Sequence, residues 1–188
     1  NDKMIKMTDA LGFDSSYKYD DLQRLVRAEL PVISGIDSAR IYTIAYDLVG
    51  NPTQMVEPNG KTTSYKYNKR NKKSNETISG NGCVSIEKEW IYDGCGNIKT
   101  LKEDGRLISY SYDNLNNLIE TDYPDGQKEI KEYDLLSRVT SIKNAQGSSK
   151  SFAYNEMDLV IEQKDEEDNY TYYLYDVWGN QTYRKEEN

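Results

Sequence analysis

Aromatic side chains in this sequence stand at alternate positions, in short runs that end in Tyr followed by Asp or Asn. In the run Tyr110-Ser111-Tyr112, for example, one small polar residue separates two rings. Residues i and i+2 of a β-strand share a face of the sheet, whereas a 3.6-residue helical period would scatter such rings around an axis. The pattern therefore predicts short strands with paired rings on one face, and an all-β protein.

The Tyr-Asp or Tyr-Asn pair occurs eight times and marks an internal repeat. Successive tyrosines are 27, 21, 25, 20, 21, 21 and 21 residues apart, so the repeat is most regular over residues 92–183. We expect residues 1–188 to form a single β-sheet segment of eight such repeats. The pairs are Tyr19-Asp20, Tyr46-Asp47, Tyr67-Asn68, Tyr92-Asp93, Tyr112-Asp113, Tyr133-Asp134, Tyr154-Asn155 and Tyr175-Asp176.

A chain reversal is predicted directly after each pair. The Asp or Asn side chain can accept backbone N–H groups of the following residues, as in an Asx-turn. Three residues further on, six of the eight positions hold Gly, Asn or Asp, which tolerate a left-handed backbone. Tyr is therefore interpreted as the last strand residue and Asp or Asn as the first turn residue. The eight positions are Gln23, Gly50, Asn71, Gly96, Asn116, Ser137, Asp158 and Gly179.

A second reversal is predicted seven residues before the signature tyrosine in most repeats. Asn-Gly and Asp-Gly at three of these sites are strong hairpin signals. The last repeat has Asp168 in the glycine position, so its turn is expected to be looser. The glycines at these reversals are Gly12, Gly60, Gly105, Gly126 and Gly147.

Residues 26–45 fit the repeat least well. The stretch Leu22 to Leu30 could form one or two turns of an amphipathic helix, but strand and loop are favoured. Together these patterns predict tandem antiparallel β-hairpins that form one twisted or curled extended sheet.

The composition is compatible with a folded sheet and disfavours two classes of partner. Apolar residues make up 36% and charged residues 30%, which leans towards disorder, but 17 tyrosines can build half-buried sheet faces. The net charge of −8 disfavours nucleic acid and membrane surfaces, and no apolar run is long enough for a membrane-spanning helix.

The sequence offers little for catalysis or metal binding. It contains no histidine, no phosphate-binding glycine loop and no catalytic triad motif. The two cysteines, Cys83 and Cys95, cannot complete a four-ligand structural metal site and are expected to remain unpaired thiols. We therefore expect no enzyme, metal or cofactor. The acidic run Asp165 to Asp168 is interpreted as a solvated loop rather than a calcium site, and the sequons at Asn75 and Asn169 as coincidental, like that at Asn180.

The repeat resembles the Rhs/YD-repeat family, found in bacterial Rhs and wall-associated proteins, the C component of Tc toxins and the teneurins. This resemblance covers residues 8–183 and implies that the sheet is part of a larger hollow shell, which in several members encloses a C-terminal toxic polypeptide. Its partners would be further repeats of the parent protein and such an enclosed polypeptide. The resemblance is carried by Tyr110-Ser111-Tyr112-Asp113 with Asn116-Asn117-Leu118, by Tyr133-Asp134 with Ser137-Arg138-Val139, and by Tyr173-Leu174-Tyr175-Asp176 with Gly179-Asn180.

The favoured function is a non-catalytic structural scaffold in a secreted or cell-surface bacterial protein. The signature pairs, and the turn glycines named below, would then be structural. The alternative is a carbohydrate or cell-wall binding module, in which Trp178, expected to be exposed in a turn, would contact sugar better than Trp90, expected to be packed. Unpaired terminal strands could also form an edge-strand dimer. The turn glycines are Gly50, Gly60, Gly96, Gly105, Gly126, Gly147 and Gly179.

Overall fold

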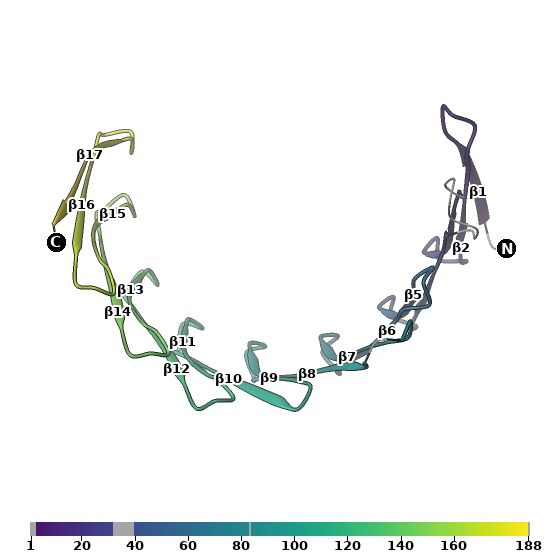
Figure 1. Cartoon of the computed structure of the whole chain (residues 1–188), viewed down its shortest axis with the longest axis horizontal. Coiled ribbons are helices and arrows are strands. Elements are labelled where there is room, and N and C mark those ends of the chain that lie inside the picture. Colours follow the sequence, from purple (N-terminus) through teal and green to yellow (C-terminus); the bar gives the residue numbers. More distant parts are fainter. Residues whose placement is uncertain (1–2, 32–39, 83, 188) are drawn as a thin grey trace. The chain divides into compact units, whose positions relative to one another are not determined.

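The computed structural model describes residues 3–31, 40–82 and 84–187, and these residues form seventeen strands and no helix (Figure 1). The all-β prediction is confirmed, and β3 rules out a helix at Leu25–Leu30. Cys83 and residues 32–39 lie outside the described residues. The strands are β1 (Lys3–Thr8), β2 (Asp14–Tyr19), β3 (Leu25–Leu30), β4 (Arg40–Tyr46), β5 (Pro52–Val56), β6 (Thr62–Tyr67), β7 (Lys73–Ser79), β8 (Ile86–Tyr92), β9 (Ile98–Glu103), β10 (Arg106–Tyr112), β11 (Leu118–Asp122), β12 (Lys128–Tyr133), β13 (Val139–Lys143), β14 (Ser149–Tyr154), β15 (Val160–Lys164), β16 (Tyr170–Tyr175) and β17 (Gln181–Glu187).

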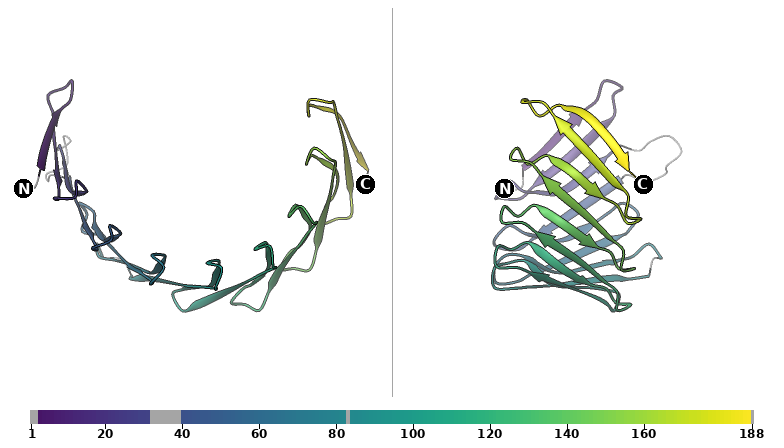
Figure 2. Two further views of the ribbon diagram at one scale, coloured as in Figure 1. Left: turned by 180° about the vertical axis from the view of Figure 1, so that it is seen from behind. Right: turned by 90° about the vertical axis from the view of Figure 1, so that its left-hand side faces the viewer.

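The chain divides into two compact units, a first unit of residues 1–90 with 102–105 and a second of residues 91–101 with 106–188. Within the first unit, strands β1 to β8 pair with their sequence neighbours in antiparallel fashion. Within the second unit, β10 to β17 do the same. Figure 2 shows the strands of the second unit side by side, with alternate turns at opposite edges.

Neither unit contains a conventional hydrophobic core among its described residues. The buried residues are Ala28, with 9% exposed, and Thr63 and Thr121, with 6% each, and no large side chain is fully buried. Each unit is a single layer of sheet (Figure 1). Cross-strand side-chain pairs and hydrogen bonds must therefore supply most of the stabilisation that a packed core supplies elsewhere.

The two faces of the sheet differ in chemistry around β10, β11 and β12. In the second unit the directly paired residues Tyr110 and Thr121 share one face with the signature tyrosines, which we call the tyrosine face. The opposite, polar face carries Glu120 and Asp122, which both accept from the Lys128 ammonium at 2.8 Å. This alternation is the period of two that the sequence pattern predicts.

Every Tyr-Asp turn has the same backbone conformation. At the fifth of them, the Asn116 N–H donates to the Asp113 carbonyl at 3.1 Å, and the Asp113 N–H donates to the Asn117 carbonyl at 3.0 Å. Asn116 has a φ of 66°, and the strand register shifts by one residue at Tyr112. This is a three-residue hairpin loop, in which a left-handed residue forms a β-bulge. All eight positions predicted to be left-handed have positive φ.

The opposite edge mostly repeats this turn. Asp168 takes the left-handed position with a φ of 70°, and its N–H donates to the Asp165 carbonyl as the glycines do in the other repeats. Asp therefore replaces Gly in this conformation, but its turn hydrogen bond is 3.3 Å long, against 2.9–3.0 Å in the glycine turns at this edge, as expected for a looser turn. Asp104 and Gly105 instead both have positive φ and join β9 directly to β10, as in a two-residue hairpin turn.

Gln23 is an unfavourable choice for the left-handed position of its turn, at a φ of 60°. We expect Gln23→Gly to raise the free energy of unfolding by up to about 1 kcal/mol, because Gly removes the steric cost of this conformation. Urea unfolding of both proteins measures the difference. Gln54→Gly, within β5, is the control and should lower stability.

Candidate functional site

The signature Asp or Asn holds each turn together through Oδ1, which accepts two backbone N–H groups, and Asp has Oδ2 as a further acceptor. Asp134 Oδ1 accepts the backbone N–H groups of Leu136 at 2.9 Å and Arg138 at 3.0 Å. Asp134 Oδ2 accepts from Arg138 Nε at 2.7 Å. One side chain therefore supplies acceptors for three donors, which explains why a short acidic or amide side chain recurs here.

Six signature tyrosines connect their repeat to the preceding one. Tyr154 donates its hydroxyl to the Val139 carbonyl at 2.7 Å, at the beginning of the strand that follows the previous Tyr-Asp turn. A tyrosine ring and its hydroxyl therefore span two neighbouring hairpins. The corresponding bonds run from Tyr46 to Leu25 (3.0 Å), Tyr67 to Pro52 (2.9 Å), Tyr112 to Ile98 (3.0 Å), Tyr133 to Leu118 (2.9 Å) and Tyr175 to Val160 (2.8 Å).

The residue four positions after the signature Asp or Asn links neighbouring turns. Asn97 Nδ2 donates to Asn116 Oδ1 at 2.8 Å, and Asn117 Nδ2 donates to Ser137 Oγ at 3.0 Å. Arg138 Nη1 donates to the Asn155 carbonyl at 3.0 Å. A chain of side-chain hydrogen bonds therefore follows the Tyr-Asp edge of the second unit.

Sequence reasoning missed this turn-to-turn ladder. Its signal is Asn or Arg four residues after the signature residue, found in six of the eight repeats. The guanidinium of Arg138 also lies 4.8 Å from the ring centroid of Tyr154, and that of Arg24 lies 4.6 Å from Tyr46. Cation–π contacts of this kind add to the coupling between repeats. The six residues are Arg24, Asn51, Asn97, Asn117, Arg138 and Asn180.

These hydrogen bonds lower the pKa of the turn carboxylates. The backbone N–H of Arg138, followed by its guanidinium, lowers the pKa of Asp134 below the ordinary value of 3.8. The side-chain amide of Asn117 does the same for Asp113, and that of Asn180 for Asp176. Each carboxylate is thus stabilised in its charged form by donors fixed in the turn.

Acid should therefore weaken the fold. A depressed folded-state pKa stabilises the protein above the unfolded-state pKa, and this stability is lost as the pH falls through the folded-state pKa. We expect the urea midpoint to fall steeply below about pH 4. Asp113→Asn should reduce this acid sensitivity, since Asn68 and Asn155 serve the same turn without a charge. A midpoint that is constant down to about pH 3 would contradict the role of the carboxylates.

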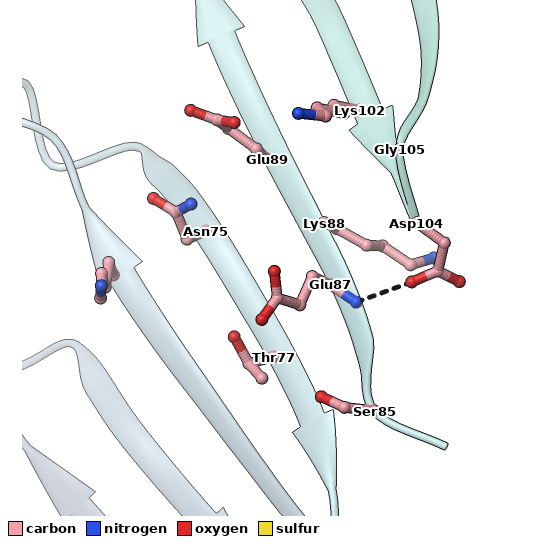
Figure 3. Close-up of a pocket in the computed structure, with 10 residues that line it drawn as sticks. Asn75, Thr77, Ser85, Glu87, Lys88, Glu89, Lys102, Asp104 and Gly105 are labelled. Atoms are coloured by element: carbon pink, nitrogen blue, oxygen red, sulfur yellow. Dashed lines mark hydrogen bonds between the residues drawn. The ribbon is translucent and has the colours of Figure 1, made fainter.

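A shallow polar groove of 440 Å³ lies in the first unit (Figure 3). It is lined by side chains including Asn75, Thr77, Glu87 and Lys102, and the Glu87 N–H donates to Asp104 Oδ1 at 3.0 Å beside it. None of its lining residues is aromatic. Within the described ranges, no three His, Cys, Asp or Glu residues gather as metal ligands, and no helix could cross a membrane.

The residues proposed as ligand contacts differ in accessibility. Trp178 lies in the last Tyr-Asp turn and is 83% exposed. Trp90 is half-buried in β8, with the ammonium of Lys73 at 5.5 Å from its ring centroid. Cys95 is exposed in a turn. The sequon residues Asn169 and Asn180 donate their side-chain amides to turn aspartates.

The comparisons identify related structures. The family model described as RHS Repeat matches residues 92–128. The crystal structure of a TcdB2–TccC3–Cdc42 complex shares 16% identity with a TM-score of 0.69, over 96% of this chain and 11% of that chain. The Tc holotoxin pore of Photorhabdus luminescens shares 15% identity with a TM-score of 0.72, over 93% and 11%. No curated protein matches the sequence significantly.

The fold therefore defines a repeat protein made of antiparallel β-hairpins in a single layer. The matched range of the RHS Repeat model spans the two signature pairs that begin at Tyr92 and Tyr112, and the same turn recurs in all eight repeats. The chain spans about a tenth of the length of the toxin chains that it resembles. At this identity the likeness to those chains shows the shared fold.

Proposed function

We propose that this chain is a non-catalytic scaffold segment of a larger, secreted or surface-exposed Rhs-like protein. The observation that carries the proposal is the double connection between repeats, by tyrosine hydroxyls and by turn side chains. The residues that recur in each repeat are therefore the ones that join neighbouring hairpins, which is a structural role. A repeat array stabilised by its neighbours can be extended to any length, which suits a wall or shell.

The proposed partners are further repeats of the parent protein and an enclosed C-terminal polypeptide. Two solved structures that share the fold contain TccC3, and one contains Cdc42 in addition. The terminal strands β1 and β17 are exposed along their whole lengths, so additional repeats could pair with either strand. Pairing with the same strand of a second copy is the edge-dimer variant of this proposal.

The test is the size and location of the native polypeptide. An antibody raised against this chain should detect, in extracellular or surface fractions of the source cells, a polypeptide much longer than 188 residues. In partial proteolysis, the polypeptide enclosed by the repeats should resist the protease, and repeat-containing fragments should accumulate beside it. A cytosolic polypeptide with no further repeats would refute the proposal, and turnover of a hydrolase substrate that persists through purification would refute the non-catalytic part.

Carbohydrate binding is a second candidate because Trp178 offers an exposed indole. We expect Trp178→Ala to reduce binding on a glycan array at least tenfold if sugar rings stack on this side chain. The folding control is the urea midpoint, which should barely change for so exposed a residue. Trp90→Tyr, which keeps a ring in the half-buried position, is the matched variant. No glycan signal above background would leave the scaffold function alone.

A further inference from the structure

Six apolar side chains lie at the tips of four successive Tyr-Asp turns between β10 and β17. We call the six residues, given at the end of this paragraph, the tip row. Turn positions of this kind ordinarily hold polar residues, and the hydrogen bonds of the turn do not require apolar side chains. The tip row consists of Leu115 (63% exposed), Leu135 (97%), Leu136 (69%), Met157 (47%), Val177 (79%) and Trp178 (83%).

The turns at the two edges of the second unit differ in the charge of their central residues. The two central residues of the four Tyr-Asp turns include a single charged residue, Glu156, among eight positions. The three turns at the opposite edge hold Asp125, Glu166 and Glu167 among six such positions. Two copies that meet at the tip row therefore bring only Glu156 together at the tips themselves, while Asp113, Asp134, Asp158 and Asp176 lie at the bases of the turns.

The spacing between successive tips also favours a second copy of this chain over a helix as the partner. Successive tips are two strands apart, roughly 9.6 Å from the usual strand separation. The apolar stripe of a partner helix with a heptad pattern would repeat about every 10.5 Å, at about 1.5 Å per residue. Over four tips, this stripe would fall out of step with the tips by roughly 3 Å. A second row of the same tips stays in step along the whole edge.

We propose that the tip row is a self-association surface that binds the tip row of a second copy of this chain in antiparallel orientation. Two-fold symmetry then places the tip of Val177 and Trp178 opposite that of Leu115. It also places Leu135 and Leu136 opposite Met157. Each tip with two apolar residues thus meets a tip with one, so large surfaces face small ones.

The expected affinity is modest. At roughly 60–120 Å² for each apolar side chain, six per copy bury about 1,000 Å² in the pair, the lower limit for a specific interface. A dissociation constant of the order of micromolar is therefore expected. The surface lies on turn tips and leaves the strand edges of β1 and β17 free for further repeats.

Sedimentation velocity over a range of micromolar concentrations tests the proposal. The chain should dimerise, and Leu135→Asn with Leu136→Asn should weaken association at least tenfold. The matched control is Ala145→Asn with Gln146→Ser at the opposite edge, which should dimerise like the parent. Circular dichroism confirms folding, and Leu135→Asn alone, at a 97% exposed residue, should also weaken the dimer. A monomer at every concentration, or a dimer unaffected by the tip substitutions, overturns the proposal.

Disulfide crosslinking tests the orientation, with Cys83→Ser and Cys95→Ser as background. Mixing Leu115→Cys with Val177→Cys protein should give crosslinked dimers between the two variants, whereas either variant alone should give few. Crosslinks within each variant alone overturn the antiparallel arrangement. A dimer lost on Arg184→Pro in β17, but not on tip substitution, identifies strand-edge pairing instead and also overturns the proposal.

Discussion

Gly80→Ala is expected to lower the free energy of unfolding by more than about 3 kcal/mol. Gly80 has a φ of +95°, and a Cβ at this position would lie 2.3 Å from the backbone carbonyl oxygen of Gly60. Ala would therefore add a backbone strain and a clash with a group that belongs to the neighbouring turn and cannot rotate away. Urea or thermal unfolding measures the loss.

Gly147→Ala is the matched control for this prediction. Gly147 has a similar φ of +92°, but no atom lies within 4 Å of the position its Cβ would take. Its cost should therefore be the conformational strain alone, about 1–2 kcal/mol. Equal losses for the two substitutions would show that the two turns do not approach each other closely near Gly80.

Tyr154→Ala is expected to lower the free energy of unfolding by about 2–4 kcal/mol. The substitution removes the hydroxyl bond to Val139 and the ring that packs against the guanidinium of Arg138. Both contacts join neighbouring hairpins, so the loss should appear in equilibrium unfolding of the whole chain. Denaturant titration followed by circular dichroism is the measurement.

Two variants separate the contributions of this ring. Tyr154→Phe keeps the ring and should cost about 1 kcal/mol for the lost hydrogen bond. Tyr183→Ala, at a 50% exposed ring in β17, should cost less than either. If Tyr183→Ala proves as damaging as Tyr154→Ala, the special role of the signature tyrosine is wrong.

The sequence predicts the hairpins well because their determinants are local. Tyr ends the strand before every Tyr-Asp turn, and Gln23 and Ser137 adopt the left-handed position even though their residue types do not favour it. The fixed hydrogen bonds of the turn outweigh the preference of a single residue. The same local rule explains why Asp168 adopts the left-handed conformation that glycine has in other repeats.

Contacts between repeats were beyond sequence reasoning because they depend on how neighbouring hairpins are placed. The direction of the Asn117 amide, which reaches Ser137, follows from the bulge and twist of two separate turns. The approach of Gly80 to Gly60 likewise joins residues twenty positions apart. The sequence places Leu135 in a predicted turn, and the structure adds that this side chain is 97% exposed.

Stepwise removal of hairpins tests the central claim most directly, since stability here comes from contacts between adjoining repeats. Deleting residues 150–188 removes Tyr154 and Tyr175 with their hydroxyl bonds. A clear drop in the urea midpoint and a less cooperative transition are predicted for the shortened protein. An unchanged midpoint would mean that each hairpin is stable alone, and would contradict the account.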